Sequence, residues 1–189
     1  MMINIIKSNK TWELPFQARR CKMKIVLKKL SFIASVIIIF VLLYYYVFFV
    51  IIVPSASMYP TIDIGDRIIT TRIHDSDSIE RGDILVFYSD EFQETMVKRV
   101  IGLPNDKIDI DSEGNVYVNS QKLEEPYVKY PDNKSGSFNV LEGEYFFLGD
   151  FREHSLDSRK WGNPFISKEN IIGEARLIIF PFDRTSILK

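Results

Sequence analysis

An uncharged apolar run, Ser31–Val53, most constrains what this chain of 189 residues can fold into. As a helix rising about 1.5 Å per residue, its 23 residues would extend about 34 Å, more than the roughly 30 Å hydrocarbon core of a bilayer. The run therefore predicts one membrane-spanning anchor. The alternative is a cleavable signal sequence cut near Ser55-Ala56-Ser57, but the apolar core of such a sequence is typically only about 7–15 residues long.

The two sides of this run carry opposite net charges. Eight lysines and arginines and one acid, Glu13, precede Ser31, so this part carries +7, whereas the rest of the chain carries −8. Because a basic flank usually stays in the cytoplasm, we expect the N-terminus inside the cell and the C-terminal part outside. The membrane accounts for the basic segment, which argues against nucleic-acid binding.

The apolar run is not expected to be helical throughout. Three consecutive tyrosines end at Tyr46, and tyrosine favours the membrane interface. We predict a helix from about Val26 to Tyr46, followed by a membrane-proximal strand over residues 47–53 that Pro54 ends. The expected domain limits are a cytoplasmic basic segment at 1–25, the anchor and its strand at 26–53, and an extracytoplasmic domain at 54–189.

Short apolar segments separated by turns follow the anchor. The predicted strands are 67–70, 84–88, 107–110, 115–118, 145–148 and 175–180, with a hairpin at 107–118, a loop at 132–137 and a helical turn at 167–170. The single cysteine, Cys21, lies before the anchor, so the exported domain has no disulfide and depends on its core. The expected fold class is mostly β: an N-terminal transmembrane helix, then an antiparallel β-barrel or sandwich-like extracytoplasmic domain.

Ser57 and Lys98 are the candidate reactive pair. A serine hydroxyl needs a base to take its proton, and lysine can serve if burial lowers its pKa from about 10.4 by roughly three units. On a strand, Lys98 shares one face with Met96 and Val100, which are apolar. The alternatives are that Lys98 faces water from an edge strand and that Ser57 only fills a turn. His74 lies in a polar loop and is expected to be solvated.

Four segments resemble, in order, the motifs of bacterial type I signal peptidases of the short single-anchor kind. They are Ser55-Ala56-Ser57-Met58-Tyr59-Pro60-Thr61, Arg81-Gly82-Asp83-Ile84-Leu85-Val86-Phe87, Val97-Lys98-Arg99-Val100-Ile101-Gly102-Leu103-Pro104-Asn105-Asp106 and Gly149-Asp150-Phe151-Arg152-Glu153-His154-Ser155-Leu156-Asp157-Ser158-Arg159. The resemblance covers nearly the whole chain from the anchor onward.

The resemblance implies a role for each matching residue. Ser57 would be the nucleophile, Lys98 the general base, and the Ser57 N–H with the Ser55 hydroxyl the oxyanion hole. The implied supporting roles are Ser155 orienting Lys98, Asp157 pairing with Arg159, Asp150 pairing with Arg99, and Arg81 and Asp83 fixing a turn. The implied partners are exported precursors with small residues at positions −1 and −3, the bilayer and the secretion machinery. No metal or other cofactor is implied.

The chain departs from these motifs at several positions. Ala56 and Asn105 stand where glycine is frequent, and Phe151, Glu153 and His154 replace residues of the last motif. We expect His154 to face solvent. A non-proteolytic factor in pilus or surface-protein assembly is the alternative function, and a soluble self-cleaving repressor is a third. Met23-Lys24-Ile25 begins a basic-then-apolar segment, so the first 22 residues are expected to be either a dispensable extension or the result of a start assigned upstream of Met23.

Overall fold

The computed structural model describes residues 16–75 and 78–188, with side chains from residue 23 onward. It divides into two units, one up to Tyr44 and one from Tyr45, which are described separately below. Met1 and most of the basic segment 1–25 lie outside the described residues, so translation from Met23 stays a prediction.

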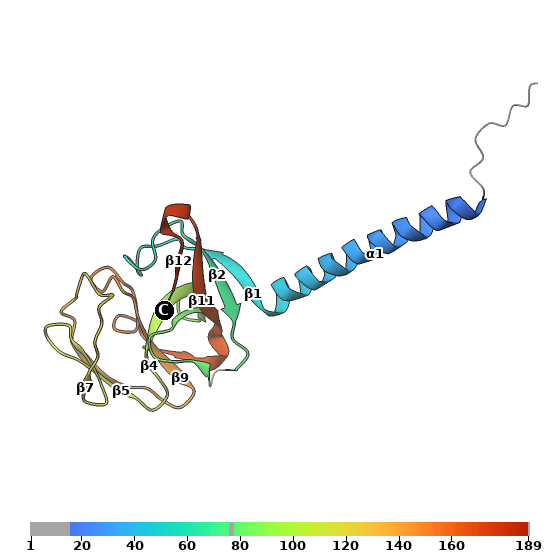
Figure 1. Cartoon of the computed structure of the whole chain (residues 1–189). Coiled ribbons are helices and arrows are strands. Elements are labelled where there is room, and N and C mark those ends of the chain that lie inside the picture. Colours follow the sequence, from blue (N-terminus) through green and yellow to red (C-terminus); the bar gives the residue numbers. More distant parts are fainter. Residues whose placement is uncertain (1–15, 76–77, 189) are drawn as a thin grey trace, which may run out of the picture. The chain divides into compact units, whose positions relative to one another are not determined.

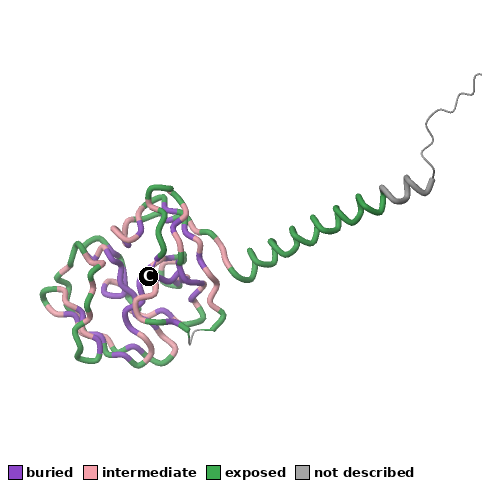
Figure 2. The backbone as a smooth tube through the Cα atoms, viewed as in Figure 1, coloured by how far each residue is buried: buried purple, intermediate pink, exposed green. Residues whose placement is uncertain are grey.

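The described part of the first unit is helical and belongs to α1, Phe16–Tyr46, whose last two residues fall in the second unit. Its part from Met23 to Tyr46 is long and apolar enough to cross a membrane, and the side chains there are exposed (green in Figure 2). The helix ends where the tyrosines predict, but it begins about ten residues before the expected start at Val26. Residues 16–25 contain no glycine or proline and are rich in good helix formers such as arginine and lysine, so nothing there ends the helix.

The second unit contains two antiparallel sheets (Figure 1). The larger sheet has the order β1-β2-β11-β3-β4-β9-β10, with β12 also paired to β11, and the smaller has the order β7-β6-β5-β8. The strands are β1 Phe48–Ile52, β2 Arg67–Arg72, β3 Ile84–Ser89, β4 Glu94–Gly102, β5 Lys107–Ile110, β6 Val116–Val118, β7 Gln121–Lys122, β8 Gly136–Asn139, β9 Glu144–Leu148, β10 Phe165–Ser167, β11 Ile171–Phe180 and β12 Ser186–Ile187. Short 3₁₀ turns occupy Lys168–Asn170 and Phe182–Arg184.

The expected mostly-β antiparallel fold class is confirmed. Each predicted strand region is a strand, β5 and β6 form the predicted hairpin, and the helical turn at 168–170 is present. Strand β1, which the sequence groups with the anchor, pairs with β2 along its whole length and is therefore the edge strand of the larger sheet. Strand β8 begins at Gly136, inside the expected loop, because β5 offers it a pairing edge.

Three buried apolar clusters hold the second unit together (purple in Figure 2). One contains Phe87 and Phe147, whose rings stack at 4.4 Å between centroids. Another contains Met58 and Ile62, which anchor the turn that follows β1. The third joins the smaller sheet to β4 and β9 through Ile101, Ile108, Ile110, Val116, Val118, Val140, Phe146 and Leu148. The smaller sheet is therefore packed against the strands that carry the site described next.

Candidate active site

A cleft of about 670 Å³ lies between the segment that follows β1 and the first half of β4. Residues 51–58 form one wall and residues 94–98 another, and the lining is completed by Ile62, Val86, His154 and Leu156. Most of these side chains are apolar. The cleft therefore brings together Ser55, Ser57 and Lys98, three of the residues singled out in the sequence.

Ser57 and Lys98 are joined by a hydrogen bond between Oγ and Nζ. Ser57 lies in a turn in which the Tyr59 N–H donates to the Ala56 carbonyl at 3.0 Å, and buried Met58 fastens this turn to the core. Lys98 lies in the middle of β4, where it is opposite Leu85 of β3. The pairing of β4 with β3 positions the Lys98 amine, and the anchored turn positions the Ser57 hydroxyl. Together they bring the two groups into hydrogen-bond contact.

The environment of Lys98 shifts its protonation equilibrium toward the neutral amine. The side chain is buried, and burial lowers the pKa of Lys98 from 10.5 to about 8. The negative charges of Asp157, Glu94 and Asp150 act in the opposite direction and keep the pKa from falling further. With a pKa of about 8, roughly a tenth of the amines are neutral at pH 7.

Replacing Lys98 with methionine should stabilise the protein. Because burial lowers the pKa of Lys98 from 10.5 to about 8, the protonated amine destabilises the folded protein by about 3 kcal/mol relative to the neutral amine. This cost is complete below pH 8 and disappears as the pH rises to 10.5, because only the unfolded chain is protonated in that interval. Thermal unfolding of Lys98→Met at pH 7 should therefore show a gain of about 1–3 kcal/mol that shrinks by pH 10. The exposed Lys134→Met is the matched control and should show no gain.

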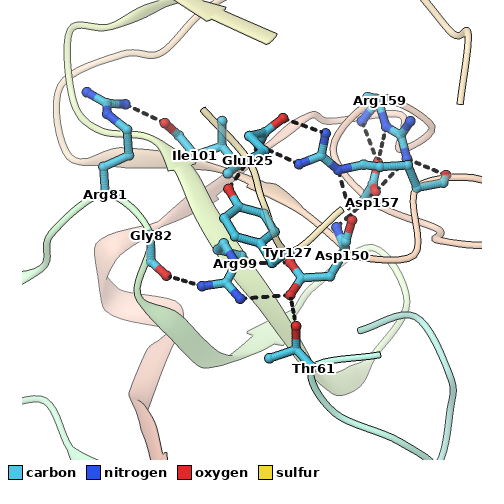
Figure 3. Close-up of polar contacts among 12 residues, drawn as sticks. Thr61, Arg81, Gly82, Arg99, Ile101, Glu125, Tyr127, Asp150, Asp157 and Arg159 are labelled. Carbon is cyan, nitrogen blue, oxygen red and sulfur yellow. Dashed lines mark hydrogen bonds and ion pairs between the residues drawn. The ribbon is translucent and has the colours of Figure 1, made fainter. Parts of the chain in front are cut away.

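Two buried ion pairs support the pair of reactive residues, and both match the expected partners (Figure 3). Arg99 donates to Asp150 twice, at 2.7 and 2.9 Å, and both side chains are almost fully buried. Thr61, which follows Ser57 in the turn after β1, donates to the same carboxylate. Arg159 and Asp157 are joined at 2.8 Å. Because both pairs are buried, they differ from ordinary surface ion pairs, which contribute little to the stability of a protein.

The segment that begins at Gly149 lies directly against the backbone of Ser57. The Phe151 N–H donates to the Ser57 carbonyl at 3.1 Å, and the Gly149 N–H donates to Asp157 at 3.1 Å. Burial on its own raises the pKa of Asp157, but the hydrogen bonds and charge of Arg159 outweigh it and hold that pKa below its ordinary value. Asp157 is therefore a charged acceptor that fixes the segment packed against the Ser57 backbone.

Ser155 does not make the hydrogen bond to Lys98 that the resemblance implies. Its buried hydroxyl makes no hydrogen bond to Lys98, and its polar neighbour is instead the Asp157 carboxylate, whose pKa it helps to lower. It lies instead against Gly149, where a Cβ atom would collide with it. The expected orienting contact is therefore missing in this structure, because the Ser155 side chain is directed at the backbone behind Ser57.

The departures from the motifs have simple structural outcomes. Ala56 does not adopt a positive φ, so the replacement of glycine there causes no strain. Asn105 does, with φ of 70°, a conformation that asparagine tolerates better than most residues. His154 is exposed as expected, but it also lines the cleft and packs edge-on against Phe151 with ring centroids 4.7 Å apart.

Three other expected residues lie outside the cleft lining. His74 is exposed, and its Nε2 bonds to the Tyr46 carbonyl at 2.8 Å. Arg81 pairs with Asp106 at 2.9 Å, and Asp83 accepts the Glu80 N–H at 2.9 Å. Arg81 and Asp83 thus hold loops in place, as expected.

Several residues of the site escaped the sequence analysis. Glu94 lines the cleft, and Arg152 is buried behind it with Glu125 as its partner. Tyr127 covers the guanidinium of Arg99 at 3.9 Å from the ring centroid. Glu125 and Tyr127 lie in an irregular segment, where no periodicity or motif marks a residue. Among the side chains that the structure describes, within residues 23–75 and 78–188, no three His, Cys, Asp or Glu form a group that could hold a metal ion.

Comparison with known proteins shows the family to which the chain belongs. Residues 26–180 match the family model described as signal peptidase, peptidase S26. A probable signal peptidase I-2 from Synechocystis is 38% identical over 144 residues, which cover 72% of this chain and 65% of the relative, so the chain spans just under two thirds of that relative's length. Signal peptidase I U from Bacillus subtilis is 36% identical over 141 residues, which cover 69% of this chain and 74% of the relative.

Among solved structures, a crystal structure of a signal peptidase I from Enterococcus faecalis V583 is similar. It has a TM-score of 0.45 and 30% sequence identity, and the similar region covers 51% of this chain and 96% of the other. Taken with the family match over residues 26–180, the relatives show that this chain belongs to the signal peptidase family, peptidase S26.

Proposed function

We propose that the chain is a membrane-anchored serine endopeptidase that removes signal peptides from exported precursors, with Ser57 as nucleophile and Lys98 as general base. One observation carries the proposal: the Ser57 hydroxyl and the buried Lys98 amine are hydrogen-bonded inside a cleft. A lysine amine whose pKa is about 8 can accept a proton near neutral pH. No histidine takes part in this pair.

The reaction follows from these groups. Neutral Lys98 takes the hydroxyl proton while Ser57 Oγ attacks the carbonyl carbon of the scissile peptide bond. The Ser57 N–H and the exposed Ser55 hydroxyl stabilise the oxyanion that forms. The C–N bond then breaks, protonated Lys98 gives its proton to the leaving amine, and an acyl-serine ester remains. Water, deprotonated by Lys98, hydrolyses this ester and restores the free serine.

The substrates would be precursors with small residues at positions −1 and −3. The apolar side chains of Ile51, Val53, Met58 and Met96 line the cleft and suit short side chains without charge. The net charge of +7 before Ser31 supports an orientation with the N-terminus in the cytoplasm and residues 54–189 outside. In that orientation the partners are the bilayer, the exported precursor and the secretion machinery that delivers it.

The proposal is tested with the full-length chain purified in detergent and a precursor peptide that carries an Ala-x-Ala site. Mass spectrometry should show a single cut after the second alanine. A matched peptide with tryptophan at −1 should stay intact, and so should the first peptide when incubated with Ser57→Ala. Intact peptide with the unchanged chain, together with binding of a pilin subunit, would instead favour the non-proteolytic assembly factor.

The pH dependence of kcat/KM should reflect the free Lys98 amine. Activity requires the unprotonated base, so kcat/KM should rise from pH 6.5 and level off above pH 9, with a midpoint near 8. Asp90→Asn is a control outside the cleft lining and should leave that midpoint unchanged. A profile that is flat between pH 6.5 and 9 would argue against a lysine base.

A further inference from the structure

An irregular segment between β7 and β8 supplies partners to the buried arginines of the site. We call residues 125–132 the strap. Although it belongs to none of the motifs, it contacts three arginines that do. The contacts are Glu125 with Arg152, Tyr127 with Arg99, and Asp132 with Arg159.

These contacts are close and largely shielded from water. Both carboxylate oxygens of Glu125 bind Arg152, at 2.6 and 2.9 Å. The ring of Tyr127 covers the Arg99 guanidinium, and its hydroxyl donates to Glu125 at 2.9 Å (Figure 3). Asp132 accepts from Arg159 at 3.1 Å. Arg152 would be left as a buried charge without its carboxylate partner if Glu125 were lost. Arg99 and Arg159 would keep Asp150 and Asp157, so for them the strap restricts position rather than supplying the counter-charge.

The arginines in turn hold the backbone behind the nucleophile. Arg152 donates to the Gly149 carbonyl at 3.0 Å, and Gly149 lies so close to the Ser57 carbonyl that a Cβ would collide with it. Arg99 binds Asp150, which also accepts from Thr61 of the nucleophile turn. Two chains of contacts thus lead from the strap to the turn that carries Ser57.

Tyr130 provides a third and more direct connection. Its ring contacts Phe151 at 4.8 Å and Tyr59, two residues after the nucleophile, at 5.9 Å between centroids. Its carbonyl accepts the Glu153 N–H at 3.3 Å. The ring is 40% exposed, so truncating it removes these contacts without leaving a cavity in the core.

We propose that the strap is a positioning element of the active site, with Tyr127 and Tyr130 as positioning residues, and that the smaller sheet serves to hold it in place. This inference rests on the proposed peptidase function. It also has an electrostatic side. Asp150 and Asp157 both raise the pKa of Lys98, and Arg99 and Arg159 neutralise them. A strap that keeps these arginines in place therefore keeps the Lys98 pKa low.

Four variants of the full-length chain test the inference. Tyr127→Phe and Tyr130→Phe keep the rings, whereas Tyr127→Leu and Tyr130→Ala remove them. The Leu and Ala variants should each lower kcat about tenfold with KM within twofold, because misplacement of a reacting group slows chemistry more than binding. The Phe variants should stay within twofold of the unchanged chain. Thermal unfolding curves check that all four variants are still folded at the assay temperature.

A second readout does not depend on turnover. NMR of protein labelled with ¹³C at the lysine ε-carbon, with the Lys98 signal assigned by its loss in Lys98→Met, follows the titration of the amine. Its midpoint should be near 8 in the unchanged chain and in Tyr127→Phe, and higher in Tyr127→Leu. If Tyr127→Leu and Tyr130→Ala match their Phe counterparts in kcat, and the Lys98 midpoint does not move in Tyr127→Leu, the strap has no positioning role. If the unchanged chain cleaves no precursor, the proposed function fails, and the NMR midpoint alone decides the role of the strap.

Discussion

Lys98→Met should lower kcat for precursor cleavage by about 10³-fold or more while leaving the fold intact. Methionine has a similar length and fills the buried site, but it cannot accept the Ser57 proton. Ser57→Ala should have an effect of the same size, because it removes the nucleophile that the amine activates. The double variant should be no slower than either single variant, since the two groups act as one unit. Single-turnover cleavage in detergent measures all three.

Lys98→Arg distinguishes loss of the base from loss of a charge. Arginine keeps a positive charge at this position but stays protonated at any pH at which the protein is folded. It should therefore be as inactive as methionine. Activity in Lys98→Arg or Lys98→Met within tenfold of the unchanged chain would contradict the lysine base and leave Ser57 to be activated in another way.

Gly149→Ala is expected to be the most damaging of the substitutions outside the reactive pair. A Cβ at this position would collide with the Ser57 carbonyl and with the buried Ser155 hydroxyl. The obstacle on one side is backbone, so it cannot rotate away as a flexible side chain would. The nucleophile turn must shift instead, and a shift of about 1 Å at a reacting group costs about 10²-fold in rate. We therefore expect kcat to fall by about 10²-fold.

Gly162→Ala is the matched control for Gly149→Ala. Its added Cβ would meet only the carboxylate end of the Glu91 side chain, at 3.3 Å or more, and Gly162 lies outside the cleft lining. This variant should keep full activity. Both alanine variants should also unfold within a few degrees of the unchanged chain if the effect at Gly149 is local. Full activity in Gly149→Ala would mean that the Ser57 backbone is not held from behind as the structure indicates.

Much of the molecule can be predicted from short stretches of sequence because the physical signals there are local. The anchor follows from the length of one uncharged run, and the hairpin at 107–118 follows from alternation around an Asp-Ser-Glu-Gly turn. The reactive pair was found from residue types and motifs, which also singled out Asp150 and Arg99 as partners. Each of these signals lies within about twenty consecutive residues.

Other features depend on contacts between distant segments. The orientation of Ser155 toward Gly149 rather than Lys98 depends on how the segment after β9 packs, and no local pattern encodes it. The same holds for Glu125 and Tyr127, which lie in an irregular segment yet meet arginines 27 and 28 residues away. Irregular segments have no periodicity that shows which of their side chains face inward.

The amino-acid order by itself predicted the anchor, the mostly-β domain, and the serine and lysine of the candidate site. Whether that lysine is a base depends on folding alone. Only the pairing of β4 with β3 and the anchoring of the turn after β1 bring the amine to the hydroxyl and bury it, and burial is what lowers its pKa. An amine in water would stay charged, because solvation of the ammonium ion is lost only when the surrounding chain excludes water.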